Sequence, residues 1–434
     1  MRTTFQIALG FSLFFSLLIM MACGGGGGSP QSLSATGSTG ASSSGSNSSG
    51  GGSSSSSQGG STASAATTTI SLSEPFAVGI AHVAGNYGFT QENFLLEGAE
   101  QIIAAGADSI FVYLTPNFRS LYPDRTSGLW TSINPTTLTD LAKSEAFDKV
   151  FMGPFKTILL TAYTFANGDQ IDGFANSQEK VSSEEQEFYD LAKYLYSQYA
   201  GTGKTFVLKN WEGDWIGLGG QGSSKKNQNI AQSRIADINA WLTARQQAVA
   251  RAREEAGRNP GVNVLNAVEV NRVLDYAQQG LTRVVNAVVP VVQPDIVTYS
   301  SYDSTTQGTD PSSLTAAMTL ALNTIKELAP DPLGLGDKRI FISEFGLYEN
   351  EFPRDVQWRT QTVLQNAKAA GLGGAFLWNV FDNECKDPYD QAAPIASLPG
   401  DRKRPTDSGC RGLWIVRPDG STSEVLNILK TYWQ

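Results

Sequence analysis

The sequence has 434 residues, a formal net charge of −9, three cysteines and a single histidine. Because nucleic-acid phosphates are bound by clustered lysine and arginine, an acidic chain of this kind predicts no nucleic-acid partner. One histidine also leaves too few ligands for the histidine-rich metal sites of many hydrolytic enzymes, so we expect no metal and no cofactor.

The first residues have the composition of an export signal. A basic start precedes an apolar stretch over residues 5–21, and Ala22 and Cys23 follow it. This stretch is typical of a secretory signal peptide and is short for a membrane-spanning helix. The segment resembles a bacterial lipoprotein signal, whose cysteine is acylated, although Met20 stands where that signal usually has leucine. The alternative is ordinary cleavage near Ala22, which leaves Cys23 as a free thiol.

The lipoprotein resemblance implies a signal peptide over residues 1–22 and an exported protein whose lipid anchor is attached to Cys23. The membrane implied is the bacterial outer membrane or cell surface. Residues 23–69 comprise this cysteine and a run of almost only Gly, Ser, Ala and Thr. Such a run buries too little apolar surface to fold, so we predict a flexible linker. Residues 70–434 are expected to form a single domain and a monomer.

From residue 70 onward, short apolar runs alternate with longer amphipathic runs. The predicted strands are 76–82, 109–114, 156–163, 205–211, 263–270, 295–301, 339–344 and 374–379. The predicted helices are 91–105, 138–147, 183–199, 229–256, a helix that continues to residue 292, 312–328, 354–370 and 423–432. Eight strand-helix units predict an α/β fold of the (β/α)8 TIM-barrel type. An open doubly wound sheet is disfavoured, because residues 81–85 lack a glycine-rich dinucleotide fingerprint.

Active sites of such barrels lie at the carboxyl ends of the strands. There the sequence places His82, Tyr113, Tyr163, Asn210, Trp211, Glu212, Glu269, Tyr299, Tyr302, Asp303, Glu344, Trp378 and Asn379. His82 has no nucleophile-elbow pattern nearby, and Lys209 is two residues early for a Schiff-base lysine and out of phase with the neighbours of Glu212. The reaction type that remains is catalysis by a pair of carboxyl groups, acting on a substrate that stacks on aromatic rings. Cleavage of a glycosidic bond is such a reaction.

Glu212 and Glu344 are the candidates for this pair, because each ends a buried apolar strand, where an unused carboxylate is costly. Their places after the fourth and seventh strands resemble the clan of retaining (β/α)8-barrel glycoside hydrolases that includes cellulases and β-glucanases. Residues 342–346 (Ile-Ser-Glu-Phe-Gly) are similar to the nucleophile segment of that clan, and residues 376–379 (Phe-Leu-Trp-Asn) to its strand-eight segment. The resemblance implies that Glu344 is a nucleophile of low pKa and Glu212 an acid/base of raised pKa.

The same resemblance implies that Trp378 forms the floor of a sugar subsite and that Tyr299 or Tyr302 hydrogen-bonds the nucleophile. The chain departs from the clan before the acid/base, where Trp211 takes the place of an asparagine. Asn210 lies one residue earlier, so residues 210–215 are a divergent or a bulged version of the segment. Asp214 is the alternative acid.

Further substrate-binding candidates at the strand ends are Asn210, Trp211, Trp215, His82, Glu269 and Asn379. The tryptophans suit stacking on sugars but also suit core packing. His82 either binds a sugar hydroxyl or has a structural hydrogen bond. Glu269 either lines a subsite or forms an ion pair with Arg272.

Cys385 and Cys410 are predicted to form a disulfide, because an exported protein is in an oxidising environment where such a pair forms a bond. The bridge closes a loop of about 26 residues, which corresponds to a stabilisation of roughly 3 kcal/mol. It lies in a long segment, residues 381–411, that we expect to form a wall of the substrate cleft.

The clan resemblance implies hydrolysis of a β-linked polysaccharide or oligosaccharide. We expect endo action, with exo action as the alternative. The competing hypothesis is a cell-surface glycan-binding lipoprotein that keeps the barrel without catalysis. The presence of both Glu212 and Glu344 argues against it, since a binding protein has no use for the pair.

Overall fold

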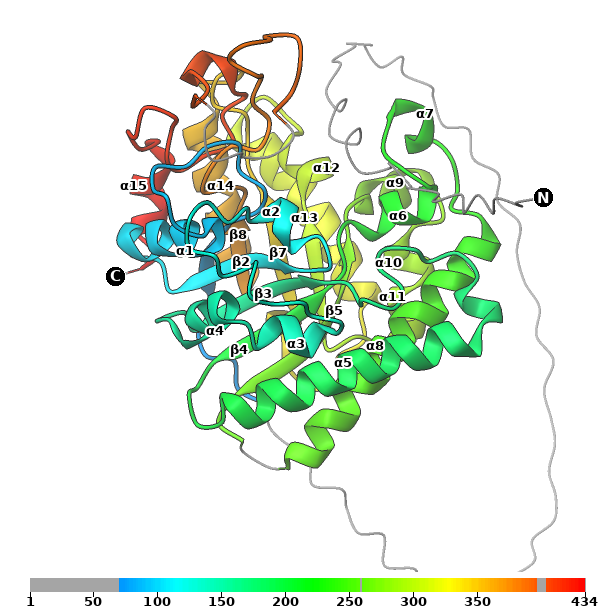
Figure 1. Cartoon of the computed structure of the whole chain (residues 1–434). Helices are drawn as coiled ribbons and strands as arrows, with labels where there is room; N and C mark the ends of the chain where they lie inside the picture. Colours follow the sequence, from blue (N-terminus) through cyan, green and yellow to red (C-terminus); the bar gives the residue numbers. More distant parts are fainter. Residues whose placement is uncertain (1–69, 258–259, 396–402, 434) are drawn as a thin grey trace, which may run out of the picture.

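The computed structural model describes residues 70–257, 260–395 and 403–433 (Figure 1). The predicted signal peptide, Cys23 and the linker therefore lie outside the described residues. Eight parallel strands close into a barrel in chain order. They are β1 (Ala77–Ala81), β2 (Ser109–Leu114), β3 (Thr157–Ala162), β4 (Thr205–Lys209), β5 (Asn263–Val270), β6 (Ile296–Ser300), β7 (Ile340–Phe345) and β8 (Gly374–Leu377). The predicted TIM barrel is confirmed.

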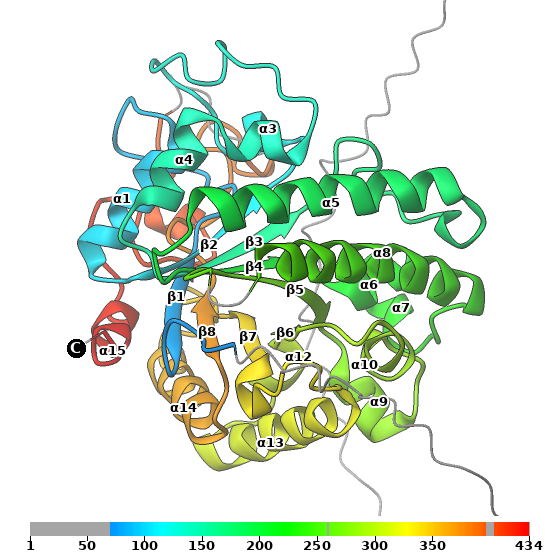
Figure 2. The same cartoon turned by 90° about the horizontal axis from the view of Figure 1, so that it is seen from below.

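Helices surround the barrel, as the view from below shows (Figure 2). The α-helices are α1 (Phe94–Ala105), α2 (Phe118–Leu121), α3 (Leu138–Ala142), α4 (Glu145–Met152), α5 (Gln178–Gln198), α6 (Gly213–Leu218), α7 (Ser223–Lys226), α8 (Gln232–Ala256), α9 (Val273–Gln279), α10 (Val284–Ala287), α11 (Val289–Val292), α12 (Tyr302–Thr305), α13 (Pro311–Leu328), α14 (Val356–Ala369) and α15 (Val425–Lys430). Within the described ranges, no helix is both long enough and apolar enough to cross a membrane.

Helix boundaries follow from local sequence. Helix α13 begins with Pro311, and the Asp310 side chain accepts hydrogen bonds from the first free backbone N–H groups. Helix α1 is capped by Asn93 and ends at Gly106, whose φ of 101° favours glycine. Most predicted helices are therefore found within a few residues of their expected ends.

Two predicted helices are wrong. Residues 138–147 form α3 and the start of α4, because Ser144 is extended, with ψ of 148°, between them. The helix expected to continue to residue 292 is broken into α9, α10 and α11. Gly280 ends α9 in a left-handed conformation, and Pro290 lies in the first turn of α11, where it needs no hydrogen-bond partner.

The core has two layers. Between the strands and the surrounding helices lies a large apolar layer, and a second, smaller layer fills the inside of the barrel. The inner layer consists of Ala77, Ala81, Phe111, Leu159, Val207, Leu265, Ala267, Ile296, Phe341 and Phe376. Because side chains alternate along a strand, a residue two positions after a member of this inner layer also points into the barrel.

The two longest helices, α5 and α8, lie side by side across one flank of the barrel (Figures 1 and 2). Buried Glu184 of α5 accepts hydrogen bonds from Trp241 Nε1 (2.8 Å) and Arg245 Nε (2.7 Å) of α8. It also accepts one from the Thr164 hydroxyl (2.7 Å), which follows β3. This network ties the helix pair to the carboxyl end of the barrel.

Candidate active site

Polar side chains occupy the inside of the barrel above the apolar layer. Lys209 follows inward-facing Val207 by two residues, and Glu269 follows inward-facing Ala267 in the same way. Both side chains are fully buried, and Lys209 Nζ lies 2.5 Å from Glu269 Oε2. Lys209 thus points into the barrel interior, 3.7 Å from Glu344 Oε1, although the sequence placed it out of phase with the neighbours of Glu212.

Glu344 reaches the same place because strand β7 contains a bulge. Tyr299 of β6 pairs with Ile342, but the next residue, Ser300, pairs with Glu344. The extra residue, Ser343, lets two consecutive side chains face the interior, as a bulge does. The Ser343 hydroxyl donates a hydrogen bond to Glu269 Oε2, and Glu344 points toward Ser300.

Glu212 arrives by a different route. Strand β4 ends at Lys209, and the chain turns so that Glu212 is the N-cap residue of α6. Its backbone N–H donates to Glu269 Oε1 at 2.7 Å, which fixes the turn from below. Gln221, from the loop after α6, donates from Nε2 to Glu212 Oε2 at 3.1 Å. The segment is therefore a turn that leaves the strand early.

One hydroxyl joins the two candidate glutamates. Ser300 Oγ lies 2.9 Å from Glu212 Oε1 and 3.4 Å from Glu344 Oε2, so these two oxygens are at most 6.3 Å apart. Both glutamates are buried, with 7% and 3% of their surfaces exposed. Glu212, Glu269 and Glu344, here named the carboxylate cluster, thus share a site of low dielectric with Lys209.

Burial of this cluster changes its acidity. Burial, followed by the charge of Glu269, raises the pKa of Glu212 to about 7. Burial and the charges of Glu269 and Glu212 also raise the pKa of Glu344 well above its ordinary range, while Lys209 opposes them. Burial and the two neighbouring carboxylates therefore oppose the low pKa expected for Glu344, whereas Lys209 and the hydrogen bond from Ser300 favour it.

Two tyrosines face the cluster. Burial is the largest cause that raises the pKa of each tyrosine. The next causes are the negative charges of Glu344 and Glu269 for Tyr113, and the charge of Glu344 for Tyr302. Tyr299 lies elsewhere: its hydroxyl donates to the Asp303 carboxylate and lies 2.8 Å from Ser304 Oγ, on the outer side of β6. Between the two tyrosines predicted to contact the nucleophile, Tyr302 is the one near Glu344.

Several predicted substrate-binding residues are structural. His82 is buried, its Nε2 lies 2.7 Å from the Phe94 carbonyl, and burial lowers its pKa to about 4. Asn379 is buried and exchanges two hydrogen bonds with the backbone of Val83. Asn210 is buried and accepts from the backbone N–H of Glu269 at 3.0 Å. These three side chains are buried and bonded to backbone groups where strands end, which is a structural role, although His82 Nδ1 has no hydrogen-bond partner among the described residues.

Asp214 is also structural. Its carboxylate accepts from the backbone N–H groups of Asn271 (2.9 Å), Arg272 (3.0 Å) and Val284 (2.7 Å). It is fully buried outside the cluster, which leaves Glu212 as the candidate acid. Arg272 pairs with Asp275, so the ion pair expected between Glu269 and Arg272 is wrong as well. Glu269 lines no subsite, because Lys209, Ser343 and Glu212 occupy its oxygens.

The tryptophans differ in exposure. Trp215 is 7% exposed, and its ring lies 5.4 Å from the Arg272 guanidinium, so it packs in the core and presents no face to a sugar. Trp378 packs on the inner layer with its ring 6.1 Å from that of Phe111, and Trp211 is also only partly buried. Trp378 and Trp211 remain the predicted stacking residues.

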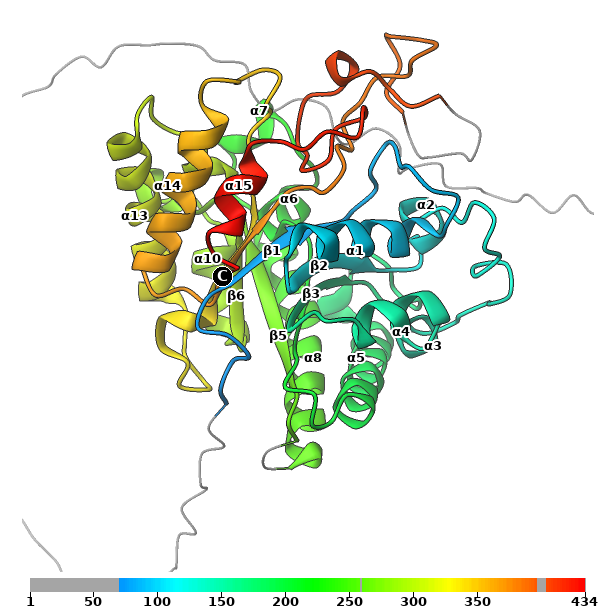
Figure 3. The ribbon, with the colours of Figure 1, turned by 90° about the vertical axis from the view of Figure 1, so that its left-hand side faces the viewer.

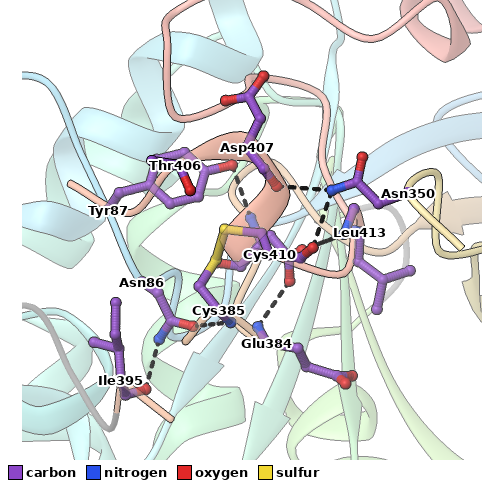
Figure 4. Close-up of a disulfide and its surroundings, with 12 residues drawn as sticks. Asn86, Tyr87, Asn350, Glu384, Cys385, Ile395, Thr406, Asp407, Cys410 and Leu413 are labelled. Carbon is purple, nitrogen blue, oxygen red and sulfur yellow. Dashed lines mark hydrogen bonds between the residues drawn. A yellow bond between two sulfur atoms is a disulfide. The ribbon is translucent and has the colours of Figure 1, made fainter. Parts of the chain in front are cut away.

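The segment after β8, expected to form a wall of the substrate cleft, lies on the side of the barrel where α6 and α7 also lie (Figures 1 and 3). The predicted disulfide joins Cys385 and Cys410, with an S–S distance of 2.04 Å (Figure 4). Arg411, next to Cys410, contacts Glu384, next to Cys385, at 2.7 Å and Glu351 of the β7 loop at 2.5 Å. Asp382 is the third member of a possible metal-ligand group with these cysteines, but their sulfurs are bonded to each other.

Replacing both Cys385 and Cys410 by serine is expected to lower the free energy of unfolding by about 3 kcal/mol, because the bridge spans 25 residues of chain. Urea unfolding followed by circular dichroism measures this loss. The wild-type protein under reducing conditions is the matched control and should lose a similar amount. An unchanged free energy would mean that the ion pairs of Arg411 hold the wall without the bridge.

No protein-family model and no curated protein matches the sequence. Similar solved structures include a broad-specificity endoglucanase from Clostridium longisporum (11% identity, TM-score 0.47, covering 84% of this chain and 99% of that chain). Another such endoglucanase, from Bacteroides salanitronis, has 14% identity and a TM-score of 0.45, with 84% and 96% covered. A xyloglucan-specific endo-β-1,4-glucanase from a metagenomic library has 11% identity and a TM-score of 0.47, with 82% and 96% covered. At these values no family is assigned, and the case for a function rests on the geometry of the carboxylate cluster.

Proposed function

We propose that this protein is a retaining β-glycoside hydrolase in which Glu344 is the nucleophile and Glu212 the general acid/base. The observation that carries the proposal is the bridge from Ser300, which keeps the two bound oxygens within 6.3 Å. Retaining glycosidases hold their carboxyl groups about 5–5.5 Å apart, whereas inverting enzymes need roughly 6.5–9.5 Å to admit a water. The upper limit of 6.3 Å between the two oxygens lies below the inverting range and supports direct attack by a carboxylate.

In the proposed reaction, a Glu344 oxygen bonds to the anomeric carbon while the bond to the leaving oxygen breaks. Glu212 gives its proton to that oxygen, which departs as a hydroxyl group. Glu212 then removes a proton from water, whose oxygen displaces Glu344 and restores both side chains. Two inversions at one carbon give retention of configuration.

The charges of the site suit this division of roles. The charge of Glu212 raises the pKa of Glu344, so the two groups titrate as a pair, and the proposal assigns them one shared proton in the active enzyme. Lys209 Nζ lies 3.7 Å from Glu344 Oε1 and therefore favours the negative charge on Glu344. The proton is then on Glu212, as an acid catalyst requires.

The pH dependence follows from the pKa of Glu212. As the pH rises through about 7, Glu212 loses the proton that the leaving group needs, so kcat/KM is expected to fall. At low pH the second carboxylate becomes protonated, and the rate should fall again. Initial rates on one soluble glycan across the acid-to-alkaline range measure both limbs. A rate that continues to rise above the pKa of Glu212 would contradict its role as an acid.

The substrate class is a β-linked polysaccharide or oligosaccharide, attacked within the chain. This part of the proposal rests on the sequence resemblance and on the partly buried rings of Trp378 and Trp211, which follow β8 and β4. Incubation of the protein with β-glucan, mannan, xylan and galactan, with products separated by chromatography, tests it. Internal attack predicts mixed oligosaccharides at early times, and proton NMR of the first product should show the β-anomer. Tight binding of a glycan without any product would support a binding protein instead.

We also propose that the protein is exported and held at the outer membrane or cell surface, as a monomer, by lipid on Cys23. The support is the signal-like sequence before Cys23 and the linker composition after it. Cys23→Ala should move the protein from the membrane fraction to the soluble fraction and abolish labelling with a fatty-acid analogue. Retention in the membrane without label would overturn the anchor.

A further inference from the structure

A buried ion pair lies directly beneath the two candidate glutamates. Lys209 is fully buried, with Nζ 2.5 Å from Glu269 Oε2 and 4.4 Å from the centre of the Phe111 ring. A lysine is rarely buried in this way, because its charge loses hydration and must be offset by a partner. The mechanism uses neither Lys209 nor Glu269 as an acid, base or nucleophile, so their presence in the barrel needs another explanation.

Glu269 touches both halves of the site. Its Oε1 accepts the backbone N–H of Glu212 at 2.7 Å, at the turn where the chain leaves β4. Its Oε2 accepts from the hydroxyl of Ser343, the bulge residue that precedes Glu344. A single carboxylate therefore fixes the backbone at one candidate glutamate and next to the other.

Lys209 adds charge to this arrangement. It is 3.7 Å from Glu344 Oε1, an oxygen that is buried and accepts no hydrogen bond from the part of the chain that the structure describes. The titratable groups around Glu344 are Glu212 after β4, Glu269 on β5, Tyr113 on β2, Tyr302 after β6 and Lys209 itself. Lys209 is the one cation among these five groups.

We propose that Lys209 and Glu269 are positioning residues: Glu269 holds Glu212 and Glu344 in register, and Lys209 supplies the positive charge that allows Glu344 to ionise. The inference rests on the proposed function, because it assigns Glu344 a step that needs a carboxylate. It goes beyond that function by naming two residues that act through the catalytic pair without touching the substrate. Both residues would be needed at any pH where the enzyme works.

Lys209→Met and Glu269→Gln test the proposal, since they change the charge near Glu344 in opposite directions. Lys209→Met should raise the pKa of Glu344 by about one to three units and move the acidic limb of kcat/KM to higher pH. Below that limb the rate should fall about tenfold per unit. Glu269→Gln should move both limbs to lower pH, because its charge acts on Glu212 and Glu344 alike. A purely structural pair would lower kcat and leave both limbs in place.

Carboxyl carbon NMR makes the test independent of turnover. With 13C-labelled glutamate, the Glu344 resonance is assigned by its loss in Glu344→Gln, and its titration is followed in each variant. Should Lys209→Met unfold because Glu269 is left uncompensated, the double variant Lys209→Met with Glu269→Gln is compared with Glu269→Gln alone, and its Glu344 should titrate at higher pH because only Lys209 differs. An unmoved Glu344 titration in a folded variant overturns the inference. Absence of glycan turnover in the wild type overturns the proposed function instead, and the titration still decides the role of Lys209.

Discussion

Glu344→Gln is expected to abolish glycan hydrolysis while the barrel stays folded. Glutamine has nearly the same shape and can keep the contact with Ser300 Oγ, which lies 3.4 Å from Glu344 Oε2 in the wild type. Its amide, however, is a poor nucleophile and has no negative charge to form a bond with the anomeric carbon. Loss of a covalent nucleophile costs on the order of 10⁶-fold in kcat in a well-studied protease, so a loss of at least about 10⁴-fold is expected.

Initial rates on the glycan identified in the polysaccharide panel measure this loss, and circular dichroism with a thermal melt shows whether the fold is kept. Glu349→Gln is a matched control from the loop that follows the same strand. The Glu349 carboxylate accepts hydrogen bonds from Trp414 Nε1 and Arg417 and is no part of the carboxylate cluster, so its variant should keep a rate near that of the wild type. A Glu344→Gln protein that retains most of its activity would exclude Glu344 as the nucleophile.

The fold could be predicted because its signals are local and repeated. Each strand carries a short apolar run, and each following helix carries its own apolar stripe, so eight units identify a barrel even where single boundaries are wrong. The two wrongly predicted helices are each interrupted by a turn. Ser144 and Gly280 interrupt patterns whose apolar periodicity continues across them. Periodicity alone does not separate one long helix from several short ones that bury the same face.

The site was less predictable, because it depends on departures from regular strands. Strand alternation places the Lys209 side chain inside the barrel. Glu212 is no guide to the direction of that side chain, because β4 ends at Lys209 and Glu212 belongs to the following turn. The bulge that pairs Ser300 with Glu344 has no signal in the sequence. Ser300 and Gln221 were missed for a related reason: a serine inside a strand and a glutamine in a glycine-rich loop are common, and only their distances to Glu212 give them meaning.

Glu212→Gln is expected to reduce kcat on natural glycans by about 10²- to 10⁴-fold, which is the usual contribution of general acid–base catalysis. The size of the loss should depend on the leaving group. An alcohol from a sugar leaves slowly without a proton, whereas an aryl glycoside with an acidic phenol needs little help in the first step. The second step still lacks its base, so the aryl substrate should show a rapid burst of phenol followed by slow turnover.

Asp214→Asn is the matched control, because it removes the carboxylate two residues later that the sequence offered as an alternative acid. Since Asp214 accepts three backbone hydrogen bonds in a buried position, this variant should lose about 1–3 kcal/mol of unfolding free energy. Its dependence on the leaving group and its alkaline pH limb should match those of the wild type, because the proton donor is unchanged. If the burst and the loss of the limb appeared in Asp214→Asn and not in Glu212→Gln, the acid would be Asp214. The turn that follows β4 would then have to bring that side chain out of the core during the reaction.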